Sequence, residues 1–212
     1  MFTIKSFQFS PIVENTYLLY NEFNDCVIID PGCYYDAEKV VLVSFIEDKK
    51  LKPTMLLNTH CHLDHVFGNK FIAEKYNLTL QMHKNEEPVL AFAVTSGLMY
   101  NLPFDNYEGD FIFLNDGDTI QLGKDELKVL LTSGHSPGSI SFYCAKQNFV
   151  IAGDVLFKNS VGRSDLPGGN HEQLIKGIKE KLLTLPNNTI VYNGHGEATM
   201  VGIERVENAY LQ

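Results

Sequence analysis

The chain has 212 residues, which is enough for a substantial hydrophobic core and fits one domain of ordinary size. Its formal net charge is −9 and it has no dense basic stretch, which argues against a nucleic-acid partner bound through its phosphates. The longest uninterrupted apolar run, VLAFAV at residues 89–94, is too short to cross a bilayer. No signal-peptide pattern precedes Phe2, so we expect a cytoplasmic protein without a membrane partner.

Apolar runs predict strands in two groups, and periodic stretches predict helices between and after them. The first half gives strands at 2–9, 16–20, 26–30, 54–59 and 78–82, and helices at 35–50, 69–76 and 86–100. The second half gives strands at 118–122, 127–131, 139–144, 148–153 and 189–193, and helices at 171–185 and 200–211. This order predicts an α/β protein, an αββα sandwich of two mixed β-sheets flanked by helices, in a single domain over residues 1–212. A doubly wound parallel sheet is the alternative, although the hairpin-like groups argue against strict alternation.

Potential metal ligands follow four of the predicted strands. His60 follows TMLLNT, His135 follows LKVLLTSG, Asp154 follows NFVIAG, and His195 follows TIVYNG. Residues that leave a sheet at the same edge can converge on one place, where sheet proteins often hold their active sites. We therefore expect these four side chains to meet.

The segment 60–65, HCHLDH, adds three further donors and predicts a site for two ions. His60 and His62 are two positions apart, so on an extended segment they face the same side. Asp64 and His65 follow the turn and can point to a second position. We predict one cluster for each ion and a bridge between them: His60, His62 and His135 on the first metal, Asp64, His65 and His195 on the second, and Asp154 as the bridge. Nitrogen and oxygen donors without a thiolate are typical of a catalytic site rather than a structural one.

These segments resemble the motifs of the metallo-β-lactamase-fold hydrolases. The H-x-H-x-D-H motif of that family matches residues 60–65, and its other metal motifs match SGHSPGS with His135, GDVLF with Asp154 and NGHGE with His195. An early D-P-G matches IIDPG with Asp30. The resemblance covers nearly the whole chain in the right order. It implies the αββα sandwich and a centre of two divalent metal ions.

Within that family the chain resembles the short glyoxalase II-like (hydroxyacylglutathione hydrolase-like) thioester hydrolases. GDVLF followed by SVGRSDLPGGN is similar to their G-R-[ST]-D-x-P-G-G loop. The resemblance implies hydrolysis of a thioester such as an S-2-hydroxyacyl thiol by a metal-bound hydroxide, with Asp64 and Asp154 as the carboxylates beside it. Only 17 residues follow His195, too few for the C-terminal helical extension with which longer members hold glutathione, so the thiol carrier stays open.

Asp30 and Thr59 are expected to orient the ligands, because a ligating imidazole usually donates its second N–H to an oxygen. Asp30 could equally act as a turn-former before Pro31. Arg163 is the candidate to bind a substrate carboxylate, and the alternative is an Arg163–Asp165 pair within the glycine-rich loop.

Tyr100 and Tyr107 belong to an aromatic, turn-rich stretch at 97–110 that could overhang the site, and packing within that loop is the alternative role. Zinc is the expected metal, with iron and manganese as alternatives that accept the same donors. Two other functions fit the ligands: a persulfide dioxygenase with one iron at His60, His135 and Asp154, and a lactone or other ester hydrolase. The expected partner in each case is a small molecule. The sequence gives no indication of the oligomeric state.

Overall fold

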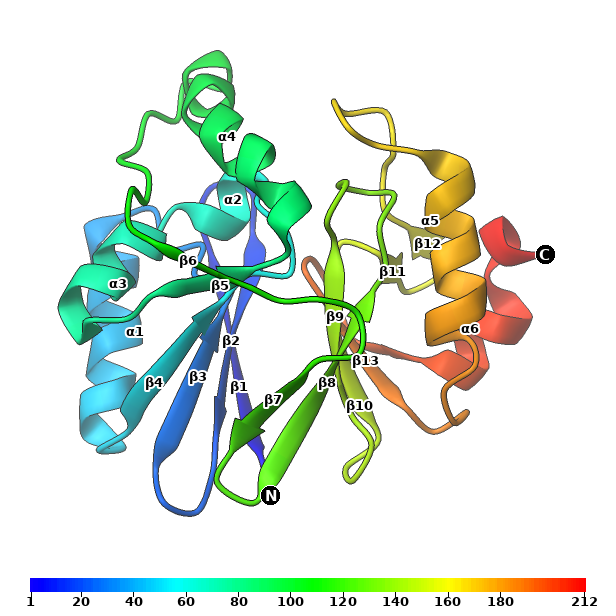
Figure 1. Cartoon of the computed structure of the whole chain (residues 1–212), viewed down its shortest axis with the longest axis horizontal. Coiled ribbons are helices and arrows are strands. Elements are labelled where there is room, and N and C mark those ends of the chain that lie inside the picture. Colours follow the sequence, from blue (N-terminus) through cyan, green and yellow to red (C-terminus); the bar gives the residue numbers. More distant parts are fainter.

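The structure, a computed structural model, describes residues 1–212. Two six-stranded β-sheets pack face to face, and helices cover the outer face of each (Figure 1). The predicted αββα sandwich is confirmed. The alternative of one doubly wound sheet is excluded, because the strands form two separate sheets. None of the helices is both long and apolar enough to span a membrane.

The first sheet comes from the N-terminal part of the chain, in the order β1-β2-β3-β4-β5-β6. Antiparallel pairing joins β1 to β2 and β2 to β3, and parallel pairing continues from β3 to β6. Its strands are β1 (Thr3–Phe9), β2 (Glu14–Tyr20), β3 (Asp25–Ile29), β4 (Lys52–Leu57), β5 (Leu80–Met82) and β6 (Phe111–Phe113). The helical elements among them are α1 (Asp36–Asp48), α2 (Leu63–Val66), α3 (Asn69–Tyr76), η1 (Lys84–Glu86) and α4 (Glu87–Met99).

The second sheet has the order β14-β13-β10-β9-β8-β7 and is antiparallel except for the parallel pair β10 and β13. Its strands are β7 (Thr119–Leu122), β8 (Asp125–Leu131), β9 (Ile140–Cys144), β10 (Phe149–Gly153), β13 (Ile190–Asn193) and β14 (Thr199–Met200). A small hairpin follows β10, made of β11 (Leu156–Phe157) and β12 (Ser160–Val161). The remaining helical elements are α5 (His171–Gly177), η2 (Ile178–Leu182), α6 (Val201–Glu207) and η3 (Ala209–Leu211).

The central strands are apolar on both faces because each sheet is covered on both sides. In β3, Val27 and Ile29 join the cluster between the two sheets, whereas Ile28 joins the cluster under α1 and α3. In β10, Ile151 faces the other sheet and Val150 faces α5 and α6. This period of two places one layer of apolar side chains on each side of every central strand. The strands are thereby fixed in register, and their ends meet at one edge of the sandwich.

Most differences from the predicted elements concern short pieces. The sequence did not indicate α2, β6, β14 or the hairpin β11–β12, which are too short to show periodicity. The predicted helix 171–185 becomes a shorter α5 continued by the wider turn η2. The predicted helix 200–211 is interrupted because Asn208 has an extended backbone, with a ψ of 109°, and its side chain caps η3.

Candidate metal centre

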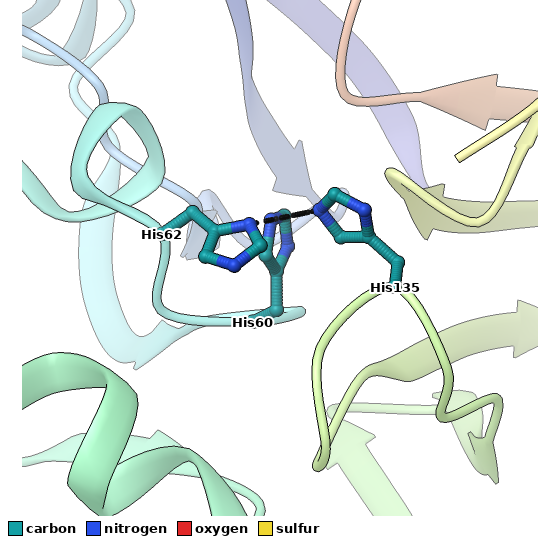
Figure 2. A group of neighbouring side chains, drawn as sticks. All are labelled: His60, His62 and His135. Atoms are coloured by element: carbon teal, nitrogen blue, oxygen red, sulfur yellow. Dashed lines mark hydrogen bonds between the residues drawn. The ribbon is translucent and has the colours of Figure 1, made fainter. Parts of the chain in front are cut away.

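The segment 58–65 leaves the end of β4 and runs into the short helix α2. Its conformation is held by Asp30, a buried carboxylate at the end of β3. Oδ1 of Asp30 accepts hydrogen bonds from the backbone N–H of Thr59 at 2.7 Å and from Nδ2 of Asn58 at 3.1 Å. Oδ2 accepts from the Thr59 hydroxyl at 2.6 Å. This network places the histidines of the segment opposite the loop that carries His135 (Figure 2).

His60, His62 and His135 form the first cluster. Nδ1 of His62 lies 2.9 Å from Nε2 of His135, which in turn lies 3.2 Å from Nε2 of His60. Figure 2 shows the three rings converging, two from the segment after β4 and one from the loop between β8 and β9. Two nitrogens on one tetrahedral zinc ion are about 3.3 Å apart, so the spacing fits a shared cation.

Asp64, His65 and His195 form the second cluster. Oδ2 of Asp64 lies 3.0 Å from Nε2 of His195 and 3.8 Å from Nε2 of His65. Asp64 and His65 belong to α2 and are buried, whereas His195 comes from the loop after β13 and its side chain is 27% exposed. One ligand atom of each residue lies within 4.8 Å of the other two.

Asp154 lies between the two clusters, at the end of β10. Its Oδ1 is 3.4 Å from Nε2 of His65, and its Oδ2 is 3.5 Å from Nε2 of His195. The same Oδ2 is 3.7 Å from Nε2 of His135 in the first cluster. One carboxylate therefore reaches both groups, which is the arrangement that a bridging ligand requires. The structure thus brings together all seven residues that the sequence nominates as ligands.

Four of the histidines use Nδ1 for an outer hydrogen bond and turn Nε2 inward. Such an outer bond fixes the tautomer and the orientation of the ring. The pairs are His65 Nδ1 with Asp30 Oδ2 at 3.1 Å, His60 Nδ1 with Thr59 Oγ1 at 3.1 Å, His135 Nδ1 with the Arg163 carbonyl at 2.7 Å, and His195 Nδ1 with the Val13 carbonyl at 3.1 Å. Because the Thr59 hydroxyl already donates to Asp30, its oxygen accepts from His60. Asp30 and Thr59 lie where the sequence places them.

The two clusters differ in their electrostatics. Burial lowers the pKa of all three histidines of the first cluster, that of His62 to about 3. Burial would also lower the pKa of His65 and His195, but the carboxylates of Asp154 and Asp64 outweigh it and raise both. Burial opposes ionisation of Asp64 and Asp154, and the charge of His65 nevertheless lowers the pKa of each. The first cluster therefore offers neutral imidazoles, whereas the second pairs ionised carboxylates with imidazoles that hold their protons more tightly.

Buried polar atoms at the centre have no partner within the protein. Nε2 of His65 and Oδ1 of Asp154 are buried without a hydrogen bond, although such atoms are normally paired. Histidine nitrogens and aspartate oxygens are common ligands of zinc, iron and manganese. The residues present therefore fit two divalent cations, one at each cluster, with Asp154 in reach of both.

The residues proposed for substrate contact have partners of their own. Nε and Nη2 of Arg163 donate to the two oxygens of Asp165, each at 2.8 Å, and this interaction lowers the pKa of Asp165 to about 2. The pair is the one that the sequence offers as the alternative role. The Tyr107 hydroxyl donates to the carbonyl of Asp110 at 2.7 Å, which is packing within the loop. Tyr100 ends α4 and is exposed, and neither tyrosine bonds to a ligand.

Three buried polar residues near the centre do not stand out in the sequence. Glu86 accepts hydrogen bonds from the loops that carry the first cluster, Glu14 has Oε1 at 3.9 Å from Nδ1 of His65, and Asn15 bonds to the loop around His195. Burial raises the pKa of both glutamates. No motif marks these residues, because each acts on a segment distant in the chain. The only sequence feature that could have indicated them is a polar residue next to an apolar run.

Comparison with known proteins is consistent with this geometry. The family model of the Metallo-beta-lactamase superfamily matches residues 10–195. The Probable metallo-hydrolase YqgX of Bacillus subtilis (strain 168) is 39% identical over 203 residues, which cover 95% of this chain and 93% of the relative. The Hydroxyacylglutathione hydrolase GloC of Haemophilus influenzae is 32% identical over 200 residues, with 93% and 92% covered.

Solved structures agree over the full length. The crystal structure of the BLEG-1 B3 metallo-beta-lactamase has a TM-score of 0.90 at 35% identity and covers 99% of this chain and 100% of that one. TTHA1623 in a di-iron-bound form has a TM-score of 0.88 at 33% identity, with 98% and 100% covered. ETHE1 from Myxococcus xanthus has a TM-score of 0.80 at 25% identity, with 98% and 83% covered. The chain belongs to the metallo-beta-lactamase superfamily.

Proposed function

We propose that the protein is a metal-dependent hydrolase that cleaves a thioester, such as an S-2-hydroxyacyl thiol. The observation that supports it most directly is the pair of clusters that share Asp154, because such nitrogen and oxygen donors would hold cations of the catalytic kind, which keep a position for water. We propose His60, His62 and His135 as ligands of one cation, the second cluster as ligands of the other, and zinc as the metal. Iron and manganese are the alternatives, and one relative is described in a di-iron-bound form.

Divalent cations at such a centre supply water of lowered pKa and a Lewis acid for a carbonyl oxygen. The side chains prepare that chemistry. Asp64 and Asp154 are ionised at neutral pH, since their pKa values are lowered, and their oxygens can orient the attacking water by accepting hydrogen bonds from it. Asp30 holds the proton of His65 on Nδ1, so that Nε2 faces the centre. A departing thiolate needs no strong acid, because thiol pKa values are about 8.5.

The loop at 160–170 supports the choice of a thioester. It borders the centre, since the Arg163 carbonyl accepts from His135 and a side-chain carbon at Gly162 would lie 3.2 Å from Nδ1 of His135. The Arg163 guanidinium is largely exposed and can bind an anionic part of the substrate. This is the loop that resembles the glyoxalase II-like enzymes, and GloC, named a hydroxyacylglutathione hydrolase, is a relative at 32% identity.

The test is metal analysis of the purified protein together with a panel of thioesters, lactones and β-lactams. We expect two divalent cations per chain, hydrolysis of hydroxyacyl thioesters, and loss of activity on chelation that returns when zinc is added. A fully loaded protein that cleaves lactones or β-lactams and leaves every thioester intact would overturn the proposal. The β-lactams belong in the panel because BLEG-1 is named a metallo-beta-lactamase.

A persulfide dioxygenase is the second candidate, favoured by the likeness to ETHE1 and by one set of distances. Nε2 of His135 lies 3.2 Å from Nε2 of His60 and 3.7 Å from Oδ2 of Asp154, which is a two-histidine, one-carboxylate set. Oxygen consumption with a small-molecule persulfide separates the two functions. One iron per chain with oxygen uptake and no thioesterase activity would establish the dioxygenase.

A further inference from the structure

His195 is held differently from the other proposed ligands. It lies between Gly194 and Gly196, and Gly196 has a φ of +74° with no atom within 4 Å of the place where a side-chain carbon would lie. The side chain of His195 is 27% exposed, whereas that of His65 is fully buried. Glycines on both sides give the backbone wide conformational freedom. The N–H of Gly194 donates to the carbonyl of Gly153 at 2.8 Å, and the remaining hydrogen bonds to this loop come from the first sheet.

Asn15, at the start of β2, supplies three of those hydrogen bonds. Its backbone N–H donates to the carbonyl of Gly194 at 2.7 Å. Its side-chain Nδ2 donates to the carbonyl of Asn193 at 3.1 Å and to that of Gly196 at 3.0 Å. One residue of the first sheet thus makes three hydrogen bonds to the three residues that surround His195. Asn15 is itself buried, and both hydrogen bonds that its side-chain NH₂ group donates go to this loop.

The residue two positions earlier completes the support. The carbonyl of Val13 accepts the hydrogen bond from Nδ1 of His195 at 3.1 Å. Val13 has a φ of 61°, a left-handed backbone that is unfavourable for a β-branched side chain. Such a conformation persists only where surrounding contacts impose it. The backbone of Glu14, between the two residues, forms an isolated bridge with His195.

We propose that Asn15 is a positioning residue of the second metal site, and that it sets the affinity of that site by holding the loop around His195. The inference rests on the proposed metal centre. Removal of the side chain frees two carbonyls of the His195 loop and leaves the first cluster untouched, since none of its residues bonds to Asn15. The affinity for the second cation should therefore fall alone. Changes in outer partners of metal ligands cost about 10–100-fold in affinity.

The experiment titrates Zn²⁺ into metal-free protein in competition with a chromophoric chelator, for wild type and Asn15→Ala. Asn21→Ala is the matched control, because Asn21 is equally buried at 4% exposure, follows the other end of β2 and bonds to the Leu122 carbonyl of the second sheet. We expect the second Zn²⁺ to bind about 10–100-fold more weakly to Asn15→Ala, with the first unchanged. Asn21→Ala should bind both ions as the wild type does.

A double-mutant cycle identifies the route of the effect. If Asn15 acts through His195, Asn15→Ala causes no further loss of metal affinity in a His195→Ala background. Equal weakening of both sites, or an undiminished second site, overturns the proposal. A wild type that binds fewer than two ions overturns the proposed centre instead, so the two failures are distinguishable. If Asn15→Ala does not fold, the same zinc titration is made with Asn15→Ser, whose hydroxyl is a shorter hydrogen-bond donor.

Discussion

The carboxylate of Glu86 accepts a hydrogen bond from the backbone N–H of Cys61 at 2.7 Å, between the two histidines that begin the metal-binding segment. Its other oxygen accepts from the Ser136 hydroxyl and the Gly138 N–H, each at 2.6 Å, in the loop that carries His135. One buried side chain thus joins the two loops that form the first cluster.

Glu86→Gln should disrupt this junction although it barely changes the shape. An amide has one acceptor oxygen, so at least one of the three donors loses its partner, at about 1–3 kcal/mol of unfolding free energy. We expect that loss in urea unfolding, and roughly 10-fold weaker binding at the first metal site. Glu38→Gln is the control, because Glu38 also has three donors, the backbone N–H groups of Ser10, Tyr34 and Tyr35, at a helix start. Unchanged metal affinity in Glu86→Gln would contradict the prediction.

Asp30→Asn tests the carboxylate behind His65. An asparagine would present its NH₂ group either to Nδ1 of His65 or to the donors of Thr59, so one of these contacts is lost. We expect the second Zn²⁺ to bind about 10–100-fold more weakly, measured by chelator competition. Asp118→Asn, at a remote turn where Asp118 accepts from the backbone of Asn115, should bind metal normally. Equal metal binding by the two variants would show that Asp30 serves only as a turn-former.

Gly194→Ala should damage both metal sites. A side-chain carbon at position 194 would lie 2.0 Å from Oδ1 of Asp154 and 2.7 Å from Cε1 of His65, so the bridging carboxylate must move. We expect at least a tenfold loss of affinity for each ion, and about 1–3 kcal/mol of destabilisation from overpacking. Gly117→Ala, in the remote turn before β7, is the control, because it adds strain at a positive φ without a nearby atom. The control variant should be less stable and still bind both ions. A Gly194→Ala variant that also binds both ions normally would contradict the predicted clash.

The two sites should respond differently to pH. Protons and cations compete for the same imidazole nitrogens in the metal-free protein. The raised pKa of His65 and His195 keeps them protonated above the usual value of about 6.5, so the affinity of the second site should rise with pH through neutrality. The lowered pKa values of the first cluster leave it deprotonated, and its affinity should be flat between about pH 6 and 8. Zinc titrations across that pH range measure the affinity of each site. The same pH dependence at both sites would contradict the prediction.

Arg163→Ala should distinguish a substrate contact from a loop contact. If the guanidinium binds a carboxylate of the thiol carrier, its loss raises KM for that thioester about 10–100-fold, corresponding to a hydrogen bond with a charged group. The kcat should change little, and a neutral thioester should show no effect. Asp165→Asn removes the charged partner of Arg163 and retains the arginine, so its KM should stay close to the wild-type value. A uniform loss of kcat in Arg163→Ala would assign the residue to the loop instead.

The fold was predictable where apolar runs were long. The strand predicted at 148–153 and the helix predicted at 35–50 carry patterns of several residues, and the structure places both within two residues of the prediction, as β10 and α1. Elements such as β11, with two residues, and α2, with four, have no period to detect. Their conformation comes from tertiary contacts, as in α2, where His65 bonds to Asn58 through its carbonyl and to Asp30 through Nδ1.

The ligands were predictable because donor side chains follow strand ends, and strand ends share an edge. Asp30 and Thr59 were within reach for the same reason. Asn15, Val13 and Glu86 were not, because they act on partners that lie 25 to 182 positions away, often through a backbone carbonyl that any residue possesses. A sequence shows which side chains are present. It does not show which backbone carbonyl will accept a hydrogen bond from which histidine.

Each cluster takes two residues from the segment after β4 and one from the facing sheet: His135 in the first case and His195 in the second. The two layers are encoded by consecutive stretches of the chain, and their interface is mainly apolar and non-directional, with a few directional hydrogen bonds such as those of Asn15 and Glu86. A pair of bound ions would therefore cross-link the two layers. It would help to fix the angle between them at this edge, which apolar packing alone does not fix. Catalysis and the alignment of the layers would then share the same bonds.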